Sequence, residues 1–341
     1  MTRISLDIGY RHPKMYQLGQ QPVAFDSVFA DLVSKSRPKV NVQSAIIEYR
    51  RCNHIINQNL VGKAWIAGSS ARNKNIYRAT MNYEKSEVAL RLGLLAFKPK
   101  NGQPFIDIDC LVTSLPELRD QTAVENIKSA FLGEHRYIRN SEEIRLMIRD
   151  VKIYPEGLGT FWLASHQGLT VPDTLTGICD LGGKTCNLVL IDESGEPIED
   201  ASSSFKVGGT YHLASLIAAD PRLVNANKGD APKLETVMNA LQSGSRYYGT
   251  TGASFAEYYE DYLEQWFSGI LSEVETRWQR YFDRLGRVIL TGGSANLIKD
   301  LIADNDYFAI PSNPQFCNVM GLLYPPQTEP EQSQLKLVET A

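Results

Sequence analysis

Two short turns in the sequence combine an aspartate with glycine, a combination that can bind phosphate and a metal ion. They lie half a chain apart and consist of Asp7-Ile8-Gly9 and Asp180-Leu181-Gly182-Gly183. Each turn stands between two strand-like runs, which is the pattern of a β-hairpin, because glycine supplies the positive φ that such turns need. A carboxylate and backbone N–H groups at each tip could close on a polyphosphate and its metal ion. The pair therefore indicates two similar domains with a nucleotide cleft between them.

The residues at these turns have distinct expected roles. We expect Asp7 and Asp180 to bind Mg²⁺ through water, since this ion prefers oxygen ligands and gives up its hydration shell reluctantly. Lys14 follows the first turn and can reach back to a β-phosphate. The N–H groups and the hydroxyl that would bind phosphate oxygens belong to Gly182, Gly183, Lys184 and Thr185.

A third glycine pair, Gly292-Gly293, separates a short apolar strand from a segment that begins at Ser294. A strand-to-helix junction of this kind is suited to nucleoside contact, because a helix N-terminus offers N–H groups. Any one of the three motifs is common in soluble proteins and most often structural. The three in this order are far more specific for a nucleotide site.

Hydrophobic patterning predicts strands and helices in both halves of the chain. In the first half, strands are expected over 105–113 and 144–154, and helices over 122–132 and 156–166. In the second half, we expect strands over 187–191, 202–207 and 287–291, a helix that opens near 208–210, and a long helix over 254–285. The long helix has apolar side chains at steps of three and four, which indicates one buried stripe.

The composition is that of a soluble globular protein with room for two domains. The chain has 341 residues, of which 43% are hydrophobic and 22% charged, with a formal net charge of −4. The longest apolar run, over 90–97, contains Arg91 and is shorter than the ~20 residues of a membrane span. The N-terminus leads directly into a strand and does not resemble a signal peptide. We therefore expect a cytoplasmic protein with no membrane partner.

The five cysteines fit a reducing compartment, because they are odd in number and show no metal-site spacing. Cys179 and Cys186 flank the second turn and could face each other across its hairpin. We favour the interpretation that Cys179 and Cys186 are small core residues in strands.

Charge is distributed unevenly along the sequence. The stretch 35–100 has thirteen Lys and Arg against three Glu, whereas 255–276 has six acidic residues and no basic one. Opposite patches of this size could steer a partner or a second copy of the chain, or they could be solvated faces.

Five segments of the chain resemble, in order, the phosphate 1, connect 1, phosphate 2, adenosine and connect 2 motifs of the actin/Hsp70/sugar-kinase superfamily. They are Leu6-Asp7-Ile8-Gly9 with Lys14, Tyr154-Pro155-Glu156-Gly157, Asp180-Leu181-Gly182-Gly183-Lys184-Thr185, Leu290-Thr291-Gly292-Gly293-Ser294 and Asn318-Val319-Met320-Gly321. Within that superfamily the chain most resembles the ParM-like bacterial and archaeal actins. Three further stretches support this resemblance, namely 60–68, 112–116 and Val207-Gly208-Gly209.

The resemblance implies a catalytic role for Glu156, with Asp7 and Asp180 beside it. In ParM-like proteins an acidic residue in connect 1 positions or activates the attacking water. The sequence around Glu156 agrees, because a carboxylate at a strand-to-helix turn can face a cleft. The alternative is a glutamate that only stabilises a helix N-terminus through the helix dipole. The resemblance also adds Gly9, Gly208, Gly292, Gly293 and Ser294 to the nucleotide-binding residues, and it places the nucleoside pocket near 233–248.

Three positions depart from the family pattern. Tyr10 stands where many members have a phosphate-binding Ser or Thr, Lys184 replaces a small residue, and Asn187 stands where an aspartate is frequent. These departures bear on the tightness and the rate of nucleotide turnover rather than on the fold.

The expected fold is α/β, with two RNase H-like domains and a nucleotide cleft between them, as in actin. Domain I would comprise 1–155 and 313–324, with a small subdomain inserted at about 35–100; domain II would comprise 156–312, and 325–341 would be a flexible tail. The resemblance implies a filament-forming protein that binds and hydrolyses ATP, or GTP, with Mg²⁺. Its partners would be further copies, head to tail, and an adaptor bound to plasmid DNA, so direct nucleic-acid contact is not required. The alternatives are a small-molecule kinase of the same superfamily and a nucleotide-binding scaffold without hydrolysis.

Overall fold

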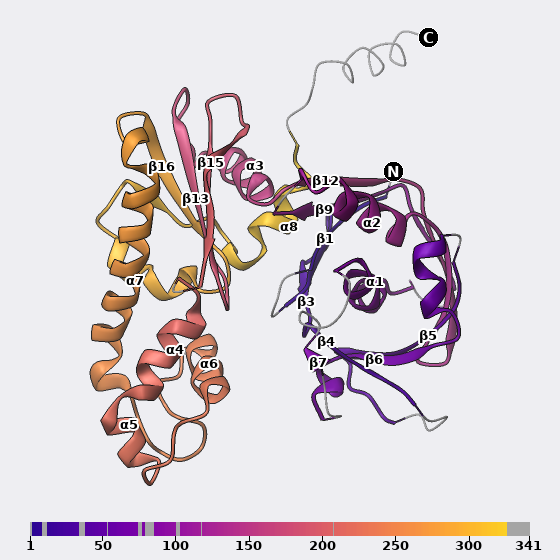
Figure 1. Ribbon diagram of the computed structural model, residues 1–341, viewed down its shortest axis with the longest axis horizontal. Helices are drawn as coiled ribbons and strands as arrows, with labels where there is room; N and C mark the ends of the chain where they lie inside the picture. Colours follow the sequence, from indigo (N-terminus) through magenta and orange to yellow (C-terminus); the bar gives the residue numbers. More distant parts are fainter. Residues whose placement is uncertain are drawn as a thin grey trace.

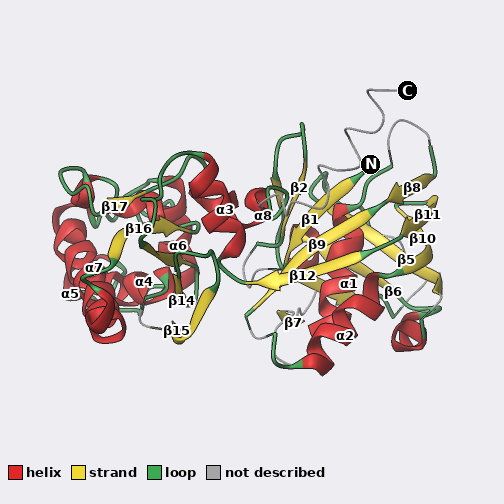
Figure 2. Cartoon of the chain, turned by 90° about the horizontal axis from the view of Figure 1, so that it is seen from above, coloured by secondary structure: helices red, strands yellow, loops and turns green. Residues whose placement is uncertain are grey.

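The computed structural model describes residues 2–8, 12–33, 38–52, 54–73, 77–78, 85–99, 103–116, 118–206 and 208–325. They form two α/β lobes that lie side by side (Figures 1 and 2). The first lobe contains two β-sheets built from residues 3–155, and the second contains a third sheet built from residues 175–309. Within the described part of the chain, no helix is both long enough and apolar enough to cross a membrane.

Two of the sheets share one topology. The sheet of order β12-β9-β1-β2-β3 consists of Val151–Pro155, Cys110–Leu115, Arg3–Asp7, Lys14–Gln17 and Val23–Ala24. The sheet of order β15-β14-β13-β16-β17 consists of Pro197–Phe205, Cys186–Ile191, Leu175–Leu181, Leu285–Thr291 and Phe308–Ala309. In each, the central strand pairs antiparallel with the next strand in sequence and parallel with its other neighbour. Both predicted hairpins, β1-β2 and β13-β14, are confirmed.

The remaining sheet has seven strands and curves around helix α1 (Lys85–Ala96), as Figure 1 shows. Its order is β7-β4-β6-β5-β10-β11-β8, with bounds Tyr77–Arg78, Val28–Asp31, Ala64–Gly68, Ser44–Cys52, Gly133–Arg139, Glu142–Ile148 and Phe105–Ile108. The longest apolar run of the sequence lies on α1, and nearly all of that helix is buried. Even Arg91 is buried there, where it pairs with Asp31 and Glu87.

The segments 105–113 and 144–154 are extended as predicted, but the prediction of one strand in each is wrong, because each contributes two strands to two different sheets. β8 and β9 separate at Asp109, and β11 and β12 separate at Arg149-Asp150. Polar contacts hold this corner: Thr2 N donates to Asp109 Oδ2 at 2.6 Å, and Arg149 pairs with Asp107 at 2.6 Å. The apolar residues continue through the corner on both segments, so the pattern in the sequence does not reveal it.

Helices cover the sheets of both lobes. They are α2 (Gln121–Phe131), α3 (Leu158–His166), α4 (Thr210–Ala219), α5 (Pro221–Ala226), α6 (Leu234–Ser243), α7 (Ala256–Trp278) and α8 (Cys317–Gly321). Short 3-10 turns are η1 (Ile55–Leu60), η2 (Ser69–Asn73), η3 (Gln279–Tyr281), η4 (Ala295–Ile298), η5 (Asp300–Ile302) and η6 (Pro314–Phe316). The predicted long helix exists but ends at Trp278, because a 3-10 turn follows and leads into β16.

Helices α3 and α8 pack against each other between the lobes (Figure 1). A Cβ on Gly321 would lie 1.6 Å from the carbonyl oxygen of Gly159, so both helices approach more closely than any larger residue allows. A small apolar cluster joins the helices to both homologous sheets through Val112, Ile178 and Val319. The predicted domain boundaries stay a prediction; the seven-stranded sheet itself takes strands from residues 28 to 148.

All five cysteines are buried free thiols. The sulfur atoms of Cys179 and Cys186 lie 3.4 Å apart across the second hairpin. These two residues are therefore small core side chains that also face each other.

Candidate functional site

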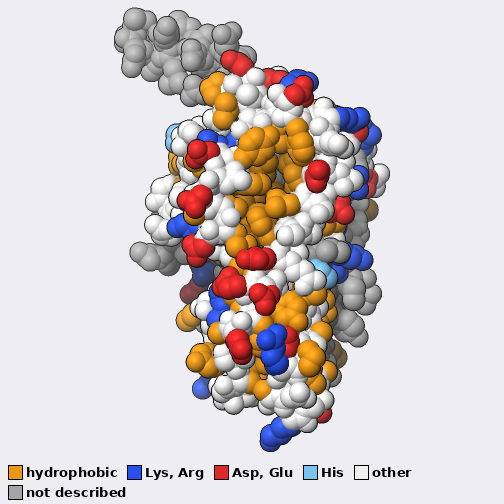
Figure 3. All heavy atoms as spheres, turned by 90° about the vertical axis from the view of Figure 1, so that its left-hand side faces the viewer, with side chains coloured by type: hydrophobic (Ala, Val, Ile, Leu, Met, Phe, Trp, Pro, Cys, Tyr) orange, Lys and Arg blue, Asp and Glu red, His pale blue; other side chains and the backbone are white. Residues whose placement is uncertain are grey.

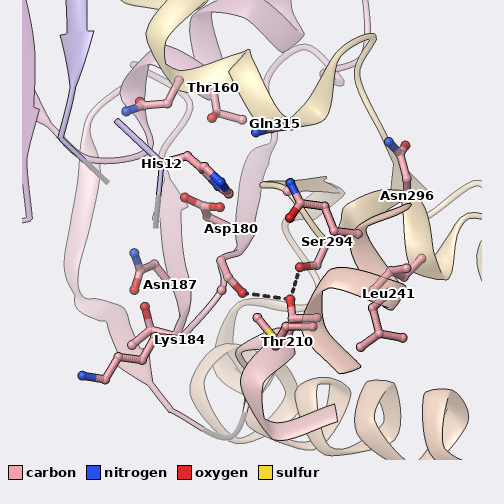
Figure 4. A pocket seen from close by; sticks show the side chains of 18 of the residues that line it. His12, Thr160, Asp180, Lys184, Asn187, Thr210, Leu241, Ser294, Asn296 and Gln315 are labelled. Atoms are coloured by element: carbon pink, nitrogen blue, oxygen red, sulfur yellow. Dashed lines mark hydrogen bonds between the residues drawn. The ribbon is translucent and has the colours of Figure 1, made fainter. Parts of the chain in front are cut away.

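A cleft of about 700 Å³ lies between the lobes, and both hairpins line it. Figure 4 shows His12 of the first lobe close to Asp180 of the second, with Thr210 and Ser294 farther along the wall. Of the predicted site residues, those that line the cleft are Asp7, Lys14, Glu156, Asp180, Gly182, Gly183, Lys184, Thr185, Gly293 and Ser294. Gly9 and Tyr10 lie outside the described residues, as does Val207.

The first hairpin brings Asp7 and Lys14 opposite each other, as neighbours across β1 and β2. Lys14 Nζ lies 3.4 Å from Asp7 Oδ2. Burial of this lysine would lower its pKa, but the carboxylates of Asp7 and Asp180 outweigh burial and raise it. Lys14 is thus a fixed positive charge beside two carboxylates from different lobes.

The second hairpin places Asp180 at the end of β13, directly before the glycines. Loss of hydration in the cleft raises the pKa of this carboxyl; Lys14 opposes the shift and Asp7 adds to it. Oxygen atoms of Asp7 and Asp180 are hard donors of the kind that Mg²⁺ binds directly or through water. Among the described residues, no group of three His, Cys, Asp or Glu side chains could enclose a metal ion alone. The donor set therefore fits an ion that keeps its water and shares ligands with a phosphate.

The loop after Asp180 is tied to the first turn of α4. Gly182 N donates to the carbonyl of Thr185 at 3.0 Å, which closes the loop on itself. The carbonyl of Gly182 accepts from Thr210 N at 3.1 Å, and that of Gly183 accepts from Tyr211 N at 2.9 Å. The loop and the helix N-terminus thus form one rigid unit at the wall of the cleft.

Gly208 and Gly292 do not line the cleft, unlike the other described glycines predicted to bind nucleotide. A Cβ on Gly208 would lie 2.3 Å from that of Cys186, so this glycine lets the loop pack on β14. A Cβ on Gly292, which has φ of 90°, would lie 2.3 Å from Asp180 Oδ1. Both glycines support the cleft wall from behind.

Ser294 connects the adenosine-like segment to α4. Its hydroxyl forms a hydrogen bond with the hydroxyl of Thr210, which Figure 4 marks, and its N–H donates to the carbonyl of Leu181 at 3.2 Å. The segment that follows consists of the 3-10 turns η4 and η5 rather than the expected helix.

Glu156 lies at the turn between β12 and α3, where Gly157 has φ of 90°. Burial raises the pKa of Glu156 to about 7; Asp7 and Asp180 add to this shift, while Lys85 and Lys14 oppose it. Asn187 Nδ2 donates to Glu156 Oε2 at 3.4 Å. The site therefore contains a carboxyl group that can take up or release a proton near neutral pH.

The structure accounts for two of the three residues that depart from the family pattern, Asn187 and Lys184. Asn187 donates a hydrogen bond to Glu156, where an aspartate could not. The side chain of Lys184 extends away from Thr210 and Ser294 (Figure 4), so it does not crowd that wall of the cleft.

Within the expected range 233–248, the residues that line the cleft include Met238, Leu241, Gln242 and Arg246. Several other cleft residues were missed by the sequence analysis. They come from the loop before β2, from α7, and from η4 and η5: His12, Tyr259, Glu260, Leu263, Asn296, Leu297, Asp300 and Leu301. Tyr259 and Leu263 belong to the buried stripe of α7, which in a sequence looks like ordinary core.

Two family models match the chain by sequence. The model of the actin-like protein N-terminal domain matches residues 5–159, which include the first hairpin and Glu156. The model of the archaeal MreB-like actin homologue C-terminal region matches residues 178–304, which include the second hairpin and the adenosine-like segment. No curated protein matches the chain.

Solved structures of actin-like proteins share the fold. The archaeal actin homologue Ta0583, in complex with ADP, is 18% identical with a TM-score of 0.74, and the match covers 94% of this chain and 98% of that one. The apo pSK41 ParM protein is 14% identical with a TM-score of 0.70 and 99% of each chain covered. A ParM subunit from a Clostridium botulinum filament is 18% identical with a TM-score of 0.67, over 94% of this chain and 97% of that one. The expected actin-like fold is confirmed, and the two family models, which both describe actin-like proteins, each match one part of the chain.

Proposed function

We propose that this protein is a filament-forming nucleotide hydrolase that binds Mg²⁺ with ATP, or GTP, between its two lobes. The observation that carries the proposal is the meeting of Asp7, Lys14 and Asp180, from the two opposed hairpins, beside the loop of Gly182 and Gly183. The ADP bound to the archaeal actin homologue supports a nucleotide in the equivalent cleft.

Each part of the cleft would perform one task. The loop that ends at Thr185 would bind phosphate oxygens through N–H groups other than that of Gly182, which already donates within the loop, and Lys14 would neutralise the charge of the phosphate. When bound, Mg²⁺ would offset the negative charge that builds up on the phosphoryl group during transfer. Asp7 and Asp180 would orient the water molecules of that ion.

Glu156 would act as the general base for the attacking water. A base works best when its pKa lies near the working pH, and the pKa of Glu156 is about 7. The hydrogen bond from Asn187 would hold the carboxylate in one orientation. The water oxygen would bond to the terminal phosphorus while the bond from that phosphorus to the oxygen of the nucleoside diphosphate breaks, and Glu156 would keep the proton taken from the water until the products are released.

Nucleotide binding would promote head-to-tail assembly, and hydrolysis would weaken the assembly. The filament of the Clostridium botulinum ParM supports this part of the proposal. An actin-like filament of this type could position plasmid DNA in the cytoplasm through an adaptor protein, with no direct contact to nucleic acid.

The test measures phosphate release and sedimentation with Mg²⁺ and ATP, GTP, ADP or no nucleotide. We expect turnover of one triphosphate and pelleting only in its presence. The variant Glu156→Gln should bind nucleotide but turn it over far more slowly than wild type, whereas Glu143→Gln, on the exposed face of β11, should behave as wild type. A protein that phosphorylates a small molecule instead would be a kinase. One that binds nucleotide without any turnover would be a scaffold.

A further inference from the structure

Two cysteines bracket the tip of the second hairpin. Cys179 precedes Asp180 on β13, and Cys186 is the first residue of β14, so only residues 180–185 separate them. Of these, Asp180 and residues 182–185 line the cleft. A bond between the two cysteines would therefore close a ring around the loop to which we assign phosphate binding.

The two thiols are positioned to react with each other. Their sulfur atoms lie 3.4 Å apart. In the register of β13 and β14, Cys179 pairs with Leu188, which is two residues from Cys186 on the same strand. Alternate residues of a strand share a face, so the two cysteines are diagonal neighbours on one face of the hairpin. An S–S bond is about 2.0 Å long, so the sulfur atoms would have to approach by about 1.4 Å to form it.

Burial of the two thiols selects a small oxidant. Both residues are 0% exposed, and burial raises the pKa of the Cys186 thiol. Neither thiol is therefore reactive while the hairpin is closed, and oxidation requires a brief local opening of the loop. Hydrogen peroxide is small and uncharged and can enter such an opening, whereas a bulky peptide disulfide would need the hairpin to unfold.

We propose that Cys179 and Cys186 form a redox-active dithiol, that a peroxide converts it into a disulfide, and that this disulfide weakens nucleotide binding. The effect on binding rests on the proposed function, whereas the oxidation itself does not. In a reducing compartment such a disulfide would be transient, which suits regulation rather than structural support.

The oxidation proceeds in two steps. The thiolate of one cysteine attacks a peroxide oxygen, the O–O bond breaks, and a sulfenic acid and one water molecule form. The second thiol then attacks the sulfenic sulfur, the S–O bond breaks, and a second water molecule leaves. The two sulfur atoms lose two electrons, which the peroxide gains, and the two water molecules take up the two thiol protons. Exchange with a dithiol reductant reverses the reaction.

The disulfide would act on the loop because the loop cannot shift as one piece. The carbonyls of Gly182 and Gly183 accept hydrogen bonds from the first turn of α4. A Cβ on Gly208 would lie 2.3 Å from the Cβ of Cys186, so Cys186 has no room to move on that side. Drawing the sulfur atoms together would then distort the hairpin tip. Loss of one hydrogen bond to a charged phosphate corresponds to about tenfold or more in affinity.

The experiment treats the whole protein with hydrogen peroxide and measures the disulfide and nucleotide binding separately. We expect the free thiols, counted under denaturing conditions, to fall from five to three. Trypsin cleaves after Lys184, between the two cysteines, so the disulfide should appear as two linked peptides that a reductant separates. The dissociation constant for ATP or GTP with Mg²⁺ should rise by about tenfold or more and return to its first value with dithiothreitol.

Two variants and a matched control locate the effect. In Cys179→Ala and in Cys186→Ala, peroxide should leave the dissociation constant unchanged. Cys110→Ala removes a buried thiol of the first lobe whose sulfur contacts Asp150, and this variant should respond to peroxide as wild type does. Thermal melting checks that the variants fold, and the peptide map of the wild-type protein tests the disulfide without any substitution.

Two results would overturn the inference while leaving the proposed function intact. One is a peptide map without the link, whether the thiols stay reduced or become sulfinic acids. The other is a linked protein that binds nucleotide as tightly as the reduced protein. If the reduced protein bound no nucleotide, the proposed function would fail, and the thiol count and the peptide map would still decide whether the dithiol is redox-active.

Discussion

Glu156 is the residue on which the proposed chemistry depends most directly. Its pKa of about 7 means that the carboxylate, the form needed in a base, becomes dominant only above neutral pH. We therefore predict that the turnover rate rises with pH through about 7 and then levels off. Glu156→Gln should lower the rate by about hundredfold or more and remove this pH dependence. Steady-state rates between pH 5.5 and 8.5 provide the measurement, and a flat wild-type profile would contradict the role.

The same pKa has a consequence for stability. Below the pKa of a free glutamate, the side chain of Glu156 is neutral in both the folded and the unfolded protein. Its ionisation then does not change the free energy of folding. Between that value and about 7 the unfolded chain loses its proton more readily, and folding is progressively penalised. Glu156→Gln should thus melt at the same temperature as wild type at pH 4 and at a higher temperature at pH 8. Equal melting temperatures at both pH values would show that Glu156 is hydrated in solution.

A substitution at Asn187 should shift the pH dependence of the turnover rate while leaving Glu156 in place. The variant Asn187→Asp replaces the amide that donates to Glu156 Oε2 with a second carboxylate. Two like charges this close favour the protonated form of one of them, so the pKa of Glu156 should rise further. The rise of turnover with pH should shift to higher pH in this variant. An unshifted profile would mean that the two side chains do not interact during turnover.

The sequence predicts the end of the cleft formed by the two hairpins far better than the end lined by α6 and α7. Hairpins such as β1-β2 and β13-β14 are local: both strands, the aspartate and the glycines follow one another in the chain. The other end draws Arg246 from a loop and Tyr259 from the buried stripe of α7, and only packing brings them together. The corner at Asp109 is missed for a similar reason, since its partners Thr2 and Arg149 are distant in sequence.

The turn between β16 and η4 packs directly against Asp180 at the end of β13. Gly292 combines a φ of 90° with a Cβ position 2.3 Å from Asp180 Oδ1. Gly292→Ala should lower the free energy of unfolding by about 3 kcal/mol, from backbone strain plus the clash, and should weaken nucleotide binding.

Gly229 has a φ of 84° and nothing within 4 Å of its Cβ position. Gly229→Ala should therefore cost only the strain, about 1 kcal/mol, and leave binding unchanged. Denaturant titrations of both variants measure the difference; equal losses would rule out the clash.

Both lobes must stay together for the cleft to hold a ligand, and an ion pair between the lobes contributes to this. Arg72 of η2 donates to Glu235 of α6 at 2.6 Å. Exposed pairs of this kind contribute up to about 1 kcal/mol. Glu235→Gln should therefore speed nucleotide release by roughly two- to fivefold. Glu193→Gln, which breaks a 2.6 Å pair with Arg284 inside the second lobe, should not change it. Stopped-flow release of a fluorescent nucleotide tests both, and identical rates in the two variants would exclude a role for the pair.

The surface of the whole molecule bears on assembly. Figure 3 views the side formed by α7 and shows a long hollow of hydrophobic side chains with acidic side chains along its borders. Exposed acidic residues of α7 include Glu257, Asp261 and Glu264, which share one face of the helix. Exposed basic residues of the first lobe include Lys39, Arg51 and Lys63. Surfaces of opposite charge on one chain favour head-to-tail contact between copies.

We predict that nucleotide-dependent pelleting depends on this attraction. The pelleted fraction should fall as salt rises from about 0.05 to about 0.5 M, because the screening length shortens several-fold. The triple variant Glu257→Lys, Asp261→Lys, Glu264→Lys should stay in the supernatant while still turning over nucleotide, since none of the three lines the cleft. Glu142→Lys with Glu143→Lys, which adds positive charge to the first lobe, should still pellet. If the triple variant pelleted as wild type does, the contact between copies would have to lie on another face, and the hollow beside α7 would not be part of it.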